Sequence, residues 1–160
     1  MTRINADLHP AVLTDQHLFA EYREMRRIPK SLLKSLAGKS AAALIGQIPA
    51  EFRLGSGHVK FFYDKGQFLI DRYALLRREL LERAYRLNDD GVFDNLGVYR
   101  QYPAFMGSRQ TLFSRDDRGL IVDRILERVR AKPHFYTLRK APIALPDYGA
   151  LLNSVLASDA

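Results

Sequence analysis

Apolar residues recur at helical spacing in three stretches of the chain. Positions 14–27, 64–84 and 114–132 each place hydrophobic side chains three or four residues apart, as the buried stripe of an amphipathic helix requires. We expect the middle helix to be the longest and the most buried. No convincing pair of strands is found, so the pattern predicts an all-α or nearly all-α fold.

Capping residues and prolines set the expected ends of these helices. Thr14 or Asp15 suits the N-cap of the first helix, because their side-chain oxygens can accept a free backbone N–H. Pro29 should stop or kink that helix, since proline has no N–H to donate. Ser114 opens a sequence like a capping box at the third helix, and Pro133 closes it.

The remaining segments are less regular. Residues 54–63 hold a glycine turn and a short apolar run of undecided state, and residues 87–114 are expected to be mostly loop. The weakly charged tail, 141–160, can form a short helix. We expect one compact domain over residues 1–145, with three helices, long irregular loops and the N-terminal segment inserted against the helices. Residues 146–160 form a C-terminal extension whose sequence leaves open whether it covers a core edge or packs on a partner.

The charge balance favours a polyanionic partner. The 160 residues hold 25 Lys and Arg against 18 Asp and Glu, a formal net charge of +7. The bases gather in residues 23–39 and 124–140, each with six bases and one acid, and Phe135 and Tyr136 lie within the second stretch. Bases interleaved with rings can follow phosphates and stack on nucleobases. A solvated basic face on an inert domain is the alternative, whereas the apolar stripes look like core rather than a membrane face.

Several kinds of chemistry are disfavoured by what the sequence lacks. It has no cysteine, so disulfides, thiolate metal sites and a cysteine nucleophile are excluded. The histidines are not at metal-ligand spacing, and no phosphate-binding loop is found, so we expect no metal and no cofactor. No apolar run is long enough to span a membrane and no export signal is recognised, so we expect a cytoplasmic protein.

One face of the first predicted helix is unusually polar. On a helical wheel, the side opposite Leu18 carries five polar residues: Gln16, His17, Arg23, Glu24 and Arg27. Two arginines one turn apart suit successive phosphates. Glu24 would repel DNA, so it either pairs with Arg27 at i+3 or takes part in chemistry. The wheel alone leaves both readings open.

Short motifs along the chain match a known family in the same order. They read Thr2-Arg3-Ile4-Asn5, Asp15-Gln16-His17-Leu18, Ala20-Glu21-Tyr22-Arg23-Glu24 with Arg27, Leu54-Gly55, Gly57-His58-Val59, Phe61-Phe62-Tyr63-Asp64-Lys65, Phe68-Leu69, and Pro133 with Phe135-Tyr136. These motifs resemble the phage-type pyrimidine-dimer DNA glycosylases, also called the phage endonuclease V family. The resemblance is specific over residues 2–27 and 54–69 and weak over 40–48 and 87–114. It is absent after about residue 145.

The resemblance implies a base-excision repair enzyme. Such an enzyme acts as a monomer on double-stranded DNA that contains pyrimidine dimers or abasic sites, near the nucleoid, without a cofactor. It cuts a glycosidic bond and then nicks the abasic strand by β-elimination from an imine. The implied nucleophile is the α-amine of Thr2, freed by removal of the initiator methionine, and the implied acid-base residue is Glu24. An α-amine has a pKa of about 7.7–8.0, so part of it is neutral near neutral pH.

The resemblance also implies DNA contacts, carried over position by position. Arg3, Arg23 and Arg27 become phosphate clamps, Gln16 and His17 lie near the abasic sugar, and Arg124 and Arg128 hold the backbone on the far side. Phe135 and Tyr136 stand where the family has four rings, which makes dimer specificity less certain than lyase chemistry. Two alternatives therefore remain: an abasic-site lyase of the same mechanism with a different lesion range, and a catalytically silent basic DNA-binding module.

Overall fold

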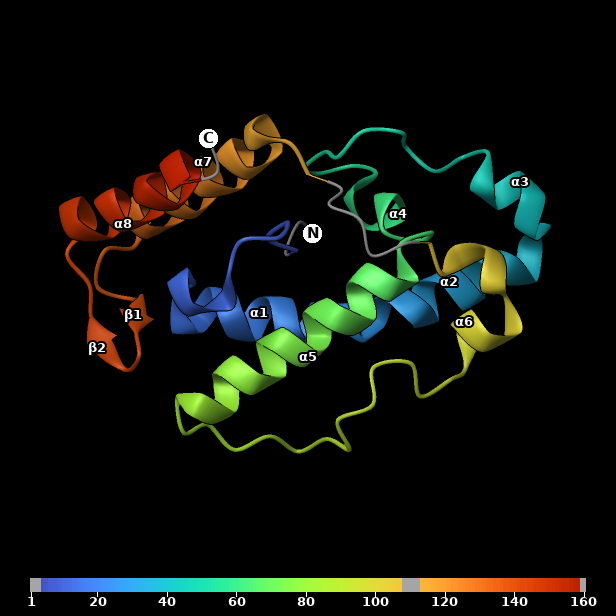
Figure 1. Cartoon of the computed structure of the whole chain (residues 1–160), viewed down its shortest axis with the longest axis horizontal. Helices are drawn as coiled ribbons and strands as arrows, with labels where there is room; N and C mark the ends of the chain where they lie inside the picture. Colours follow the sequence, from blue (N-terminus) through green and yellow to red (C-terminus); the bar gives the residue numbers. More distant parts are fainter. Residues whose placement is uncertain (1–3, 108–112, 159–160) are drawn as a thin grey trace.

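The computed structural model describes residues 4–107 and 113–158, and its regular structure is mostly helical, as the sequence pattern predicts. Figure 1 shows α1 and α5 crossing at the centre, with α7 and α8 side by side along one edge. The elements are η1 (Pro10–Val12), α1 (Asp15–Met25), α2 (Arg27–Gly38), α3 (Ala41–Ile45), α4 (His58–Phe61), α5 (Gly66–Glu82), α6 (Val98–Gln101), η2 (Pro103–Phe105), α7 (Arg115–Ala131), β1 (Thr137–Leu138), β2 (Ala141–Pro142) and α8 (Leu145–Ser158).

The three predicted helices are α1, α5 and α7, and their caps explain where they begin. Thr14 is the N-cap of α1, and its hydroxyl accepts the backbone N–H of His17. At α7 the Ser114 hydroxyl accepts the N–H of Asp117, while the Asp117 carboxylate accepts the N–H of Ser114. This capping box and the prediction from the sequence agree.

The first helix stops just before Arg27, as predicted from Pro29, but the proline itself lies in the first turn of a second helix. α1 stops at Met25 and α2 begins at Arg27, so Pro29 is the third residue of α2. The first turn of a helix has N–H groups without intrahelical partners, and proline's missing N–H costs nothing there. The three-helix arrangement therefore gains α2 as a further long helix.

A small strand pair also went unpredicted. β1 and β2 are antiparallel, and Thr137 lies opposite Pro142. Arg139 and Lys140 form the turn with φ of 50° and 66°, a conformation that usually calls for Asn or Gly. The Lys140 N–H donates to a carboxylate oxygen of Asp15 at 2.8 Å, a tertiary contact that the local sequence does not reveal.

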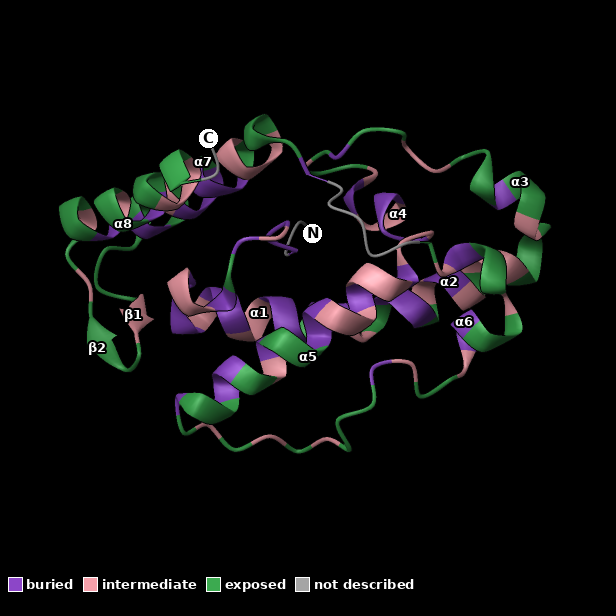
Figure 2. Cartoon of the chain, viewed as in Figure 1, coloured by how far each residue is buried: buried purple, intermediate pink, exposed green. Residues whose placement is uncertain are grey.

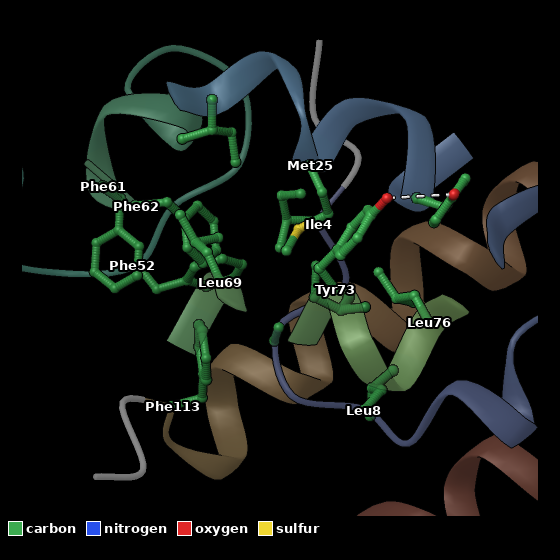
Figure 3. Close-up of a cluster of buried hydrophobic side chains, with 14 of the residues drawn as sticks. Ile4, Leu8, Met25, Phe52, Phe61, Phe62, Leu69, Tyr73, Leu76 and Phe113 are labelled. Carbon is green, nitrogen blue, oxygen red and sulfur yellow. Dashed lines mark hydrogen bonds between the residues drawn. The ribbon is translucent and has the colours of Figure 1, made fainter. Parts of the chain in front are cut away.

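The N-terminal segment is part of the core. Ile4, Ala6 and Leu8 are completely or almost completely buried, and Figure 1 shows this segment between α1 and α7. Figure 2 shows the same burial along the segment and along the facing sides of α1 and α5. In Figure 3, Ile4 lies beside Met25, near a cluster of phenylalanine rings that includes Phe113.

The C-terminal tail folds as α8 against α7. Tyr148 and Leu152 are buried, and the Tyr148 hydroxyl donates to the carbonyl oxygen of Val12 at 2.8 Å. This helix is longer than the short one the sequence allowed, and it covers a core edge. Over residues 4–107 and 113–158, no helix combines the length and the hydrophobicity that crossing a bilayer requires.

Candidate functional site

A cavity of about 450 Å³ opens between α1, α7 and the segment that follows α7, and we call it the aromatic pocket. It brings together most of the DNA-contacting residues predicted from the sequence: Gln16, His17, Arg23, Arg124, Arg128, Phe135 and Tyr136. Asn5 of the N-terminal segment also lines it. Residues more than one hundred positions apart in the sequence thus line one cavity.

His17 is buried in the wall of this pocket, so the predicted outward orientation is wrong for it. It is 7% exposed, and its ring stacks on Tyr136 with centroids 4.8 Å apart and planes 10° from parallel. Its Nδ1 lies 2.6 Å from the Thr14 hydroxyl. Burial, with the nearby charges of Arg124 and Arg128, lowers the pKa of His17 to about 3. The imidazole is therefore neutral near pH 7.

Hydrogen bonds from Thr137 to the start of α1 hold the segment that carries Phe135 and Tyr136. The Gln16 side chain accepts the N–H of Thr137 at 2.9 Å, and the Thr137 hydroxyl donates to Asp15 at 2.6 Å. Asp15 also accepts from Arg83 at 2.8 Å. Burial alone would raise the pKa of Asp15, but these hydrogen bonds and the Arg83 charge lower it overall. The Gln16 amide, predicted to lie near the sugar, positions the segment that carries the rings.

The two rings at the pocket mouth differ in exposure. Phe135 is 57% exposed and meets Tyr136 edge to face, with centroids 5.1 Å apart. Tyr136 is half-buried because His17 covers one face of it. An exposed aromatic ring in a pocket that Arg23 and Arg128 also line can stack on a nucleobase.

A buried polar network holds Asn5, and the sequence analysis did not find it. The Asn5 amide donates to Glu21 at 2.7 Å, and Arg124 donates to the Asn5 carbonyl oxygen at 2.5 Å. Glu21 is fully buried and binds Arg72 through both carboxylate oxygens, at 2.7 and 3.0 Å. Burial, with the Arg128 charge, lowers the pKa of Arg124 to about 10, so it stays a cation near pH 7.

His58 binds the backbone of Ile4, the residue before Asn5. Its Nε2 accepts the backbone N–H of Ile4 at 3.2 Å, so Nδ1 carries the proton and donates to the carbonyl oxygen of Arg53 at 2.8 Å. Burial lowers the pKa of His58 to about 4, although the bond to Arg53 opposes this. His58 thus fixes the backbone of Ile4, and Glu21 and Arg124 fix the side chain of Asn5. Thr2 and Arg3, the predicted nucleophile and phosphate clamp, lie outside the described residues.

Glu24 opens onto a second cavity, of about 650 Å³, which we call the Arg53 groove. Arg27, Arg53 and Lys60 also line this groove. Glu24 is 9% exposed, so its predicted outward orientation is wrong as well. Its carboxylate lies 3.7 Å from a guanidinium nitrogen of Arg27, so the i+3 ion pair is present. That pair does not exclude chemistry, because Glu24 still lines an open groove.

The two buried histidines make stability depend on pH. The unfolded chain binds protons at His17 and His58 below the ordinary pKa of 6.5, but the folded chain binds them only near pH 3 and 4. Between pH 6.5 and 4 the unfolded state therefore holds more protons, and stability falls as pH falls. Each histidine contributes a loss of up to about 1.4 kcal/mol per pH unit. Urea unfolding at pH 7 and pH 5 measures this loss.

Nuclear magnetic resonance separates these two histidines from other titrating groups. The imidazole signals of His17 and His58 are expected to stay constant between pH 5.5 and 8. A titration midpoint above pH 6 for either ring would contradict its burial as a neutral group.

Among the residues that the structure describes, no three His, Asp or Glu side chains gather closely enough to hold a metal ion.

A family model described as "Pyrimidine dimer DNA glycosylase" matches residues 1–91, which is more than half of the chain. The matched part contains α1, the N-terminal segment and the Arg53 groove, whereas Arg124, Arg128 and the two rings lie beyond it. This protein therefore belongs to the pyrimidine dimer DNA glycosylase family.

Proposed function

We propose that this protein cleaves the glycosidic bond of cyclobutane pyrimidine dimers in double-stranded DNA and then nicks the abasic strand by β-elimination. The observation that carries the proposal is the anchoring of residues 4 and 5 between the two cavities. Asn5 lines the aromatic pocket, and Ile4 is bound by His58, whose other ring nitrogen donates to the carbonyl oxygen of Arg53, a residue that lines the Arg53 groove. This anchoring supports a role for the nearby chain end in the chemistry.

The proposed nucleophile is the α-amine of Thr2 after removal of the initiator methionine. Two residues span at most about 7 Å, which limits how far from Ile4 the amine can act. Its lone pair forms a bond to the sugar C1′ as the bond from C1′ to the base breaks, and the base leaves with the bonding electrons and takes up a proton. No oxidant, reductant or metal enters this step.

Glu24 supplies the proton transfers in this proposal. Its carboxylate stabilises positive charge at C1′, and its near burial strengthens that interaction. Opening of the sugar ring moves electrons to O4′, which takes a proton as the imine forms. Removal of a C2′ proton by the carboxylate then breaks the C3′–O bond, and the 3′ phosphate leaves.

The aromatic pocket binds the DNA around this centre. Arg23, Arg124 and Arg128 provide cations for backbone phosphates, and Arg3 is assigned the same role from the resemblance. Phe135 and Tyr136 provide rings for stacking. Since there are two rings where the family pattern has four, an abasic-site lyase with a different lesion range is the second candidate.

Nicking assays separate these functions. Duplexes that carry one thymine dimer, one abasic site or no lesion are incubated with the protein, and strand breaks are measured by electrophoresis. The proposal expects breaks at the dimer and at the abasic site. Breaks at the abasic site alone indicate the altered lesion range. Binding without any break indicates the silent DNA-binding module and refutes the proposal.

Cleavage is expected to proceed unchanged in excess chelator. The imine withdraws electrons from C1′ and acidifies the C2′ proton, so elimination needs no metal ion to stabilise charge. The measurement is the nicking rate of the dimer duplex with and without EDTA. If EDTA abolished cleavage and added magnesium restored it, the imine mechanism would be wrong.

A further inference from the structure

The Arg53 groove contains bases that the proposed reaction does not use. It lies between the junction of α1 and α2 and the turn before α4, and Arg27, Ser31, Arg53, Ser56 and Lys60 contribute polar side chains. Among the described residues that line it, Glu24 is the only acid, and Glu24 is already next to Arg27. The rest of the groove therefore carries a positive charge that its own walls do not neutralise.

The local backbone holds Arg53 across the turn. Gly57 has a φ of +85°, and a Cβ at this position would lie 3.0 Å from Cδ of Arg53. A glycine here thus provides both the left-handed conformation and the space for the aliphatic part of the arginine. The carbonyl oxygen of Arg53 accepts the Nδ1–H of His58, which fixes the backbone below the side chain.

Arg53 and Lys60 differ from the arginines of the core in their partners. Arg72 and Arg83 are buried in ion pairs with carboxylates. Within residues 4–107 and 113–158, neither Arg53 nor Lys60 forms an ion pair, and Arg53 is exposed. Cations without an ion-pair partner in a groove attract a polyanion.

We propose that the Arg53 groove, which Glu24 also lines, binds backbone phosphates of the DNA duplex. This inference rests on the proposed function for the nature of the ligand. Arginine and lysine side chains, with the hydroxyls of Ser31 and Ser56, are the groups that commonly contact phosphate oxygens. DNA that contacts both cavities meets basic side chains in each of them.

The salt dependence of DNA binding tests the groove without any chemistry. The double variant Arg53→Gln/Lys60→Gln and the wild type are titrated with an undamaged duplex by fluorescence anisotropy over a series of salt concentrations. The slope of log K against log salt is negative, and each lost phosphate contact reduces its magnitude by about 0.9, so the magnitude should fall by about 1.8 in the double variant. Thermal unfolding of both proteins checks that the variant is folded.

A matched control removes the same charge elsewhere. Arg78 and Arg100 are exposed and line neither cavity, so Arg78→Gln/Arg100→Gln should keep the wild-type slope. The swap Arg53→Lys/Lys60→Arg keeps both charges and should also keep the slope. A wild-type slope in the glutamine variant, or an equal loss in the control, would overturn the proposal. Absence of nicking by the wild type refutes the proposed function. The salt dependence of binding still tests the groove in that case, because it is measured without any cleavage.

Discussion

Replacing Glu24 with glutamine is expected to abolish dimer cleavage while DNA affinity stays equal or rises. The amide has the shape of the carboxylate but can neither stabilise positive charge at C1′ nor accept the C2′ proton. Loss of these contributions lowers the rate by about 10²- to 10⁴-fold. Affinity should not fall, because the change removes a negative charge beside the bases of the Arg53 groove. The nicking rate and anisotropy titrations measure the two effects.

The alternative role of Glu24, an ion pair with Arg27, makes a different prediction. The Arg27 side chain is 71% exposed, so this pair stabilises the fold by at most about 0.5 kcal/mol. If the pair were the whole role, Glu24→Gln would cleave DNA at the wild-type rate. Glu82→Gln is the control, since Glu82 is an exposed acid that pairs with Arg78 on α5. Unchanged cleavage in Glu24→Gln would remove the residue from the mechanism.

Replacing Glu21 with alanine is expected to destabilise the protein by about 3–5 kcal/mol, because an uncompensated charge then remains buried. Glu21 is fully buried, and its partner Arg72 has a side chain that is 2% exposed. The change also removes the acceptor of the Asn5 amide. The free energy of unfolding in urea gives the effect directly.

A control and a double variant separate the buried ion pair from other losses. Glu82→Ala breaks the exposed pair with Arg78 and should cost no more than about 0.5 kcal/mol. Replacing Glu21 and Arg72 together with methionine removes both charges and should recover much of the stability. A loss below about 1 kcal/mol in Glu21→Ala would show that the pair is not desolvated as its burial indicates.

The sequence predicted the helices whose capping residues and apolar spacing lie within the helix itself. Thr14 and Ser114 cap helices through atoms only three residues away, so their positions could be read from the chain. α2 was missed because Pro29 signals a stop, and only the preceding residues decide whether it lies inside a new first turn. The turn at Arg139 depends on Asp15, which is remote in the sequence, and no local pattern could reveal it.

The sequence predicted many of the residues that line the aromatic pocket, but not which way their side chains point. The residues of the aromatic pocket follow from charge and from the resemblance, but a helical wheel treats α1 as isolated. His17 is buried because the ring of Tyr136 stacks on it, and Glu24 is largely buried although it lines the open Arg53 groove. A signal for Glu21 did exist: it lies three residues after Leu18, beside the apolar stripe, where an acid must find a buried partner.

The most direct test of the account is the chemical identity of the covalent intermediate. The protein is incubated with a duplex carrying one thymine dimer in the presence of borohydride, which reduces an imine to a stable amine, and the adduct is mapped by peptide mass spectrometry. The imine mechanism predicts a sugar attached to the α-amine of Thr2, with the initiator methionine absent. An adduct on a lysine side chain, or no adduct while strand breaks accumulate, would contradict it.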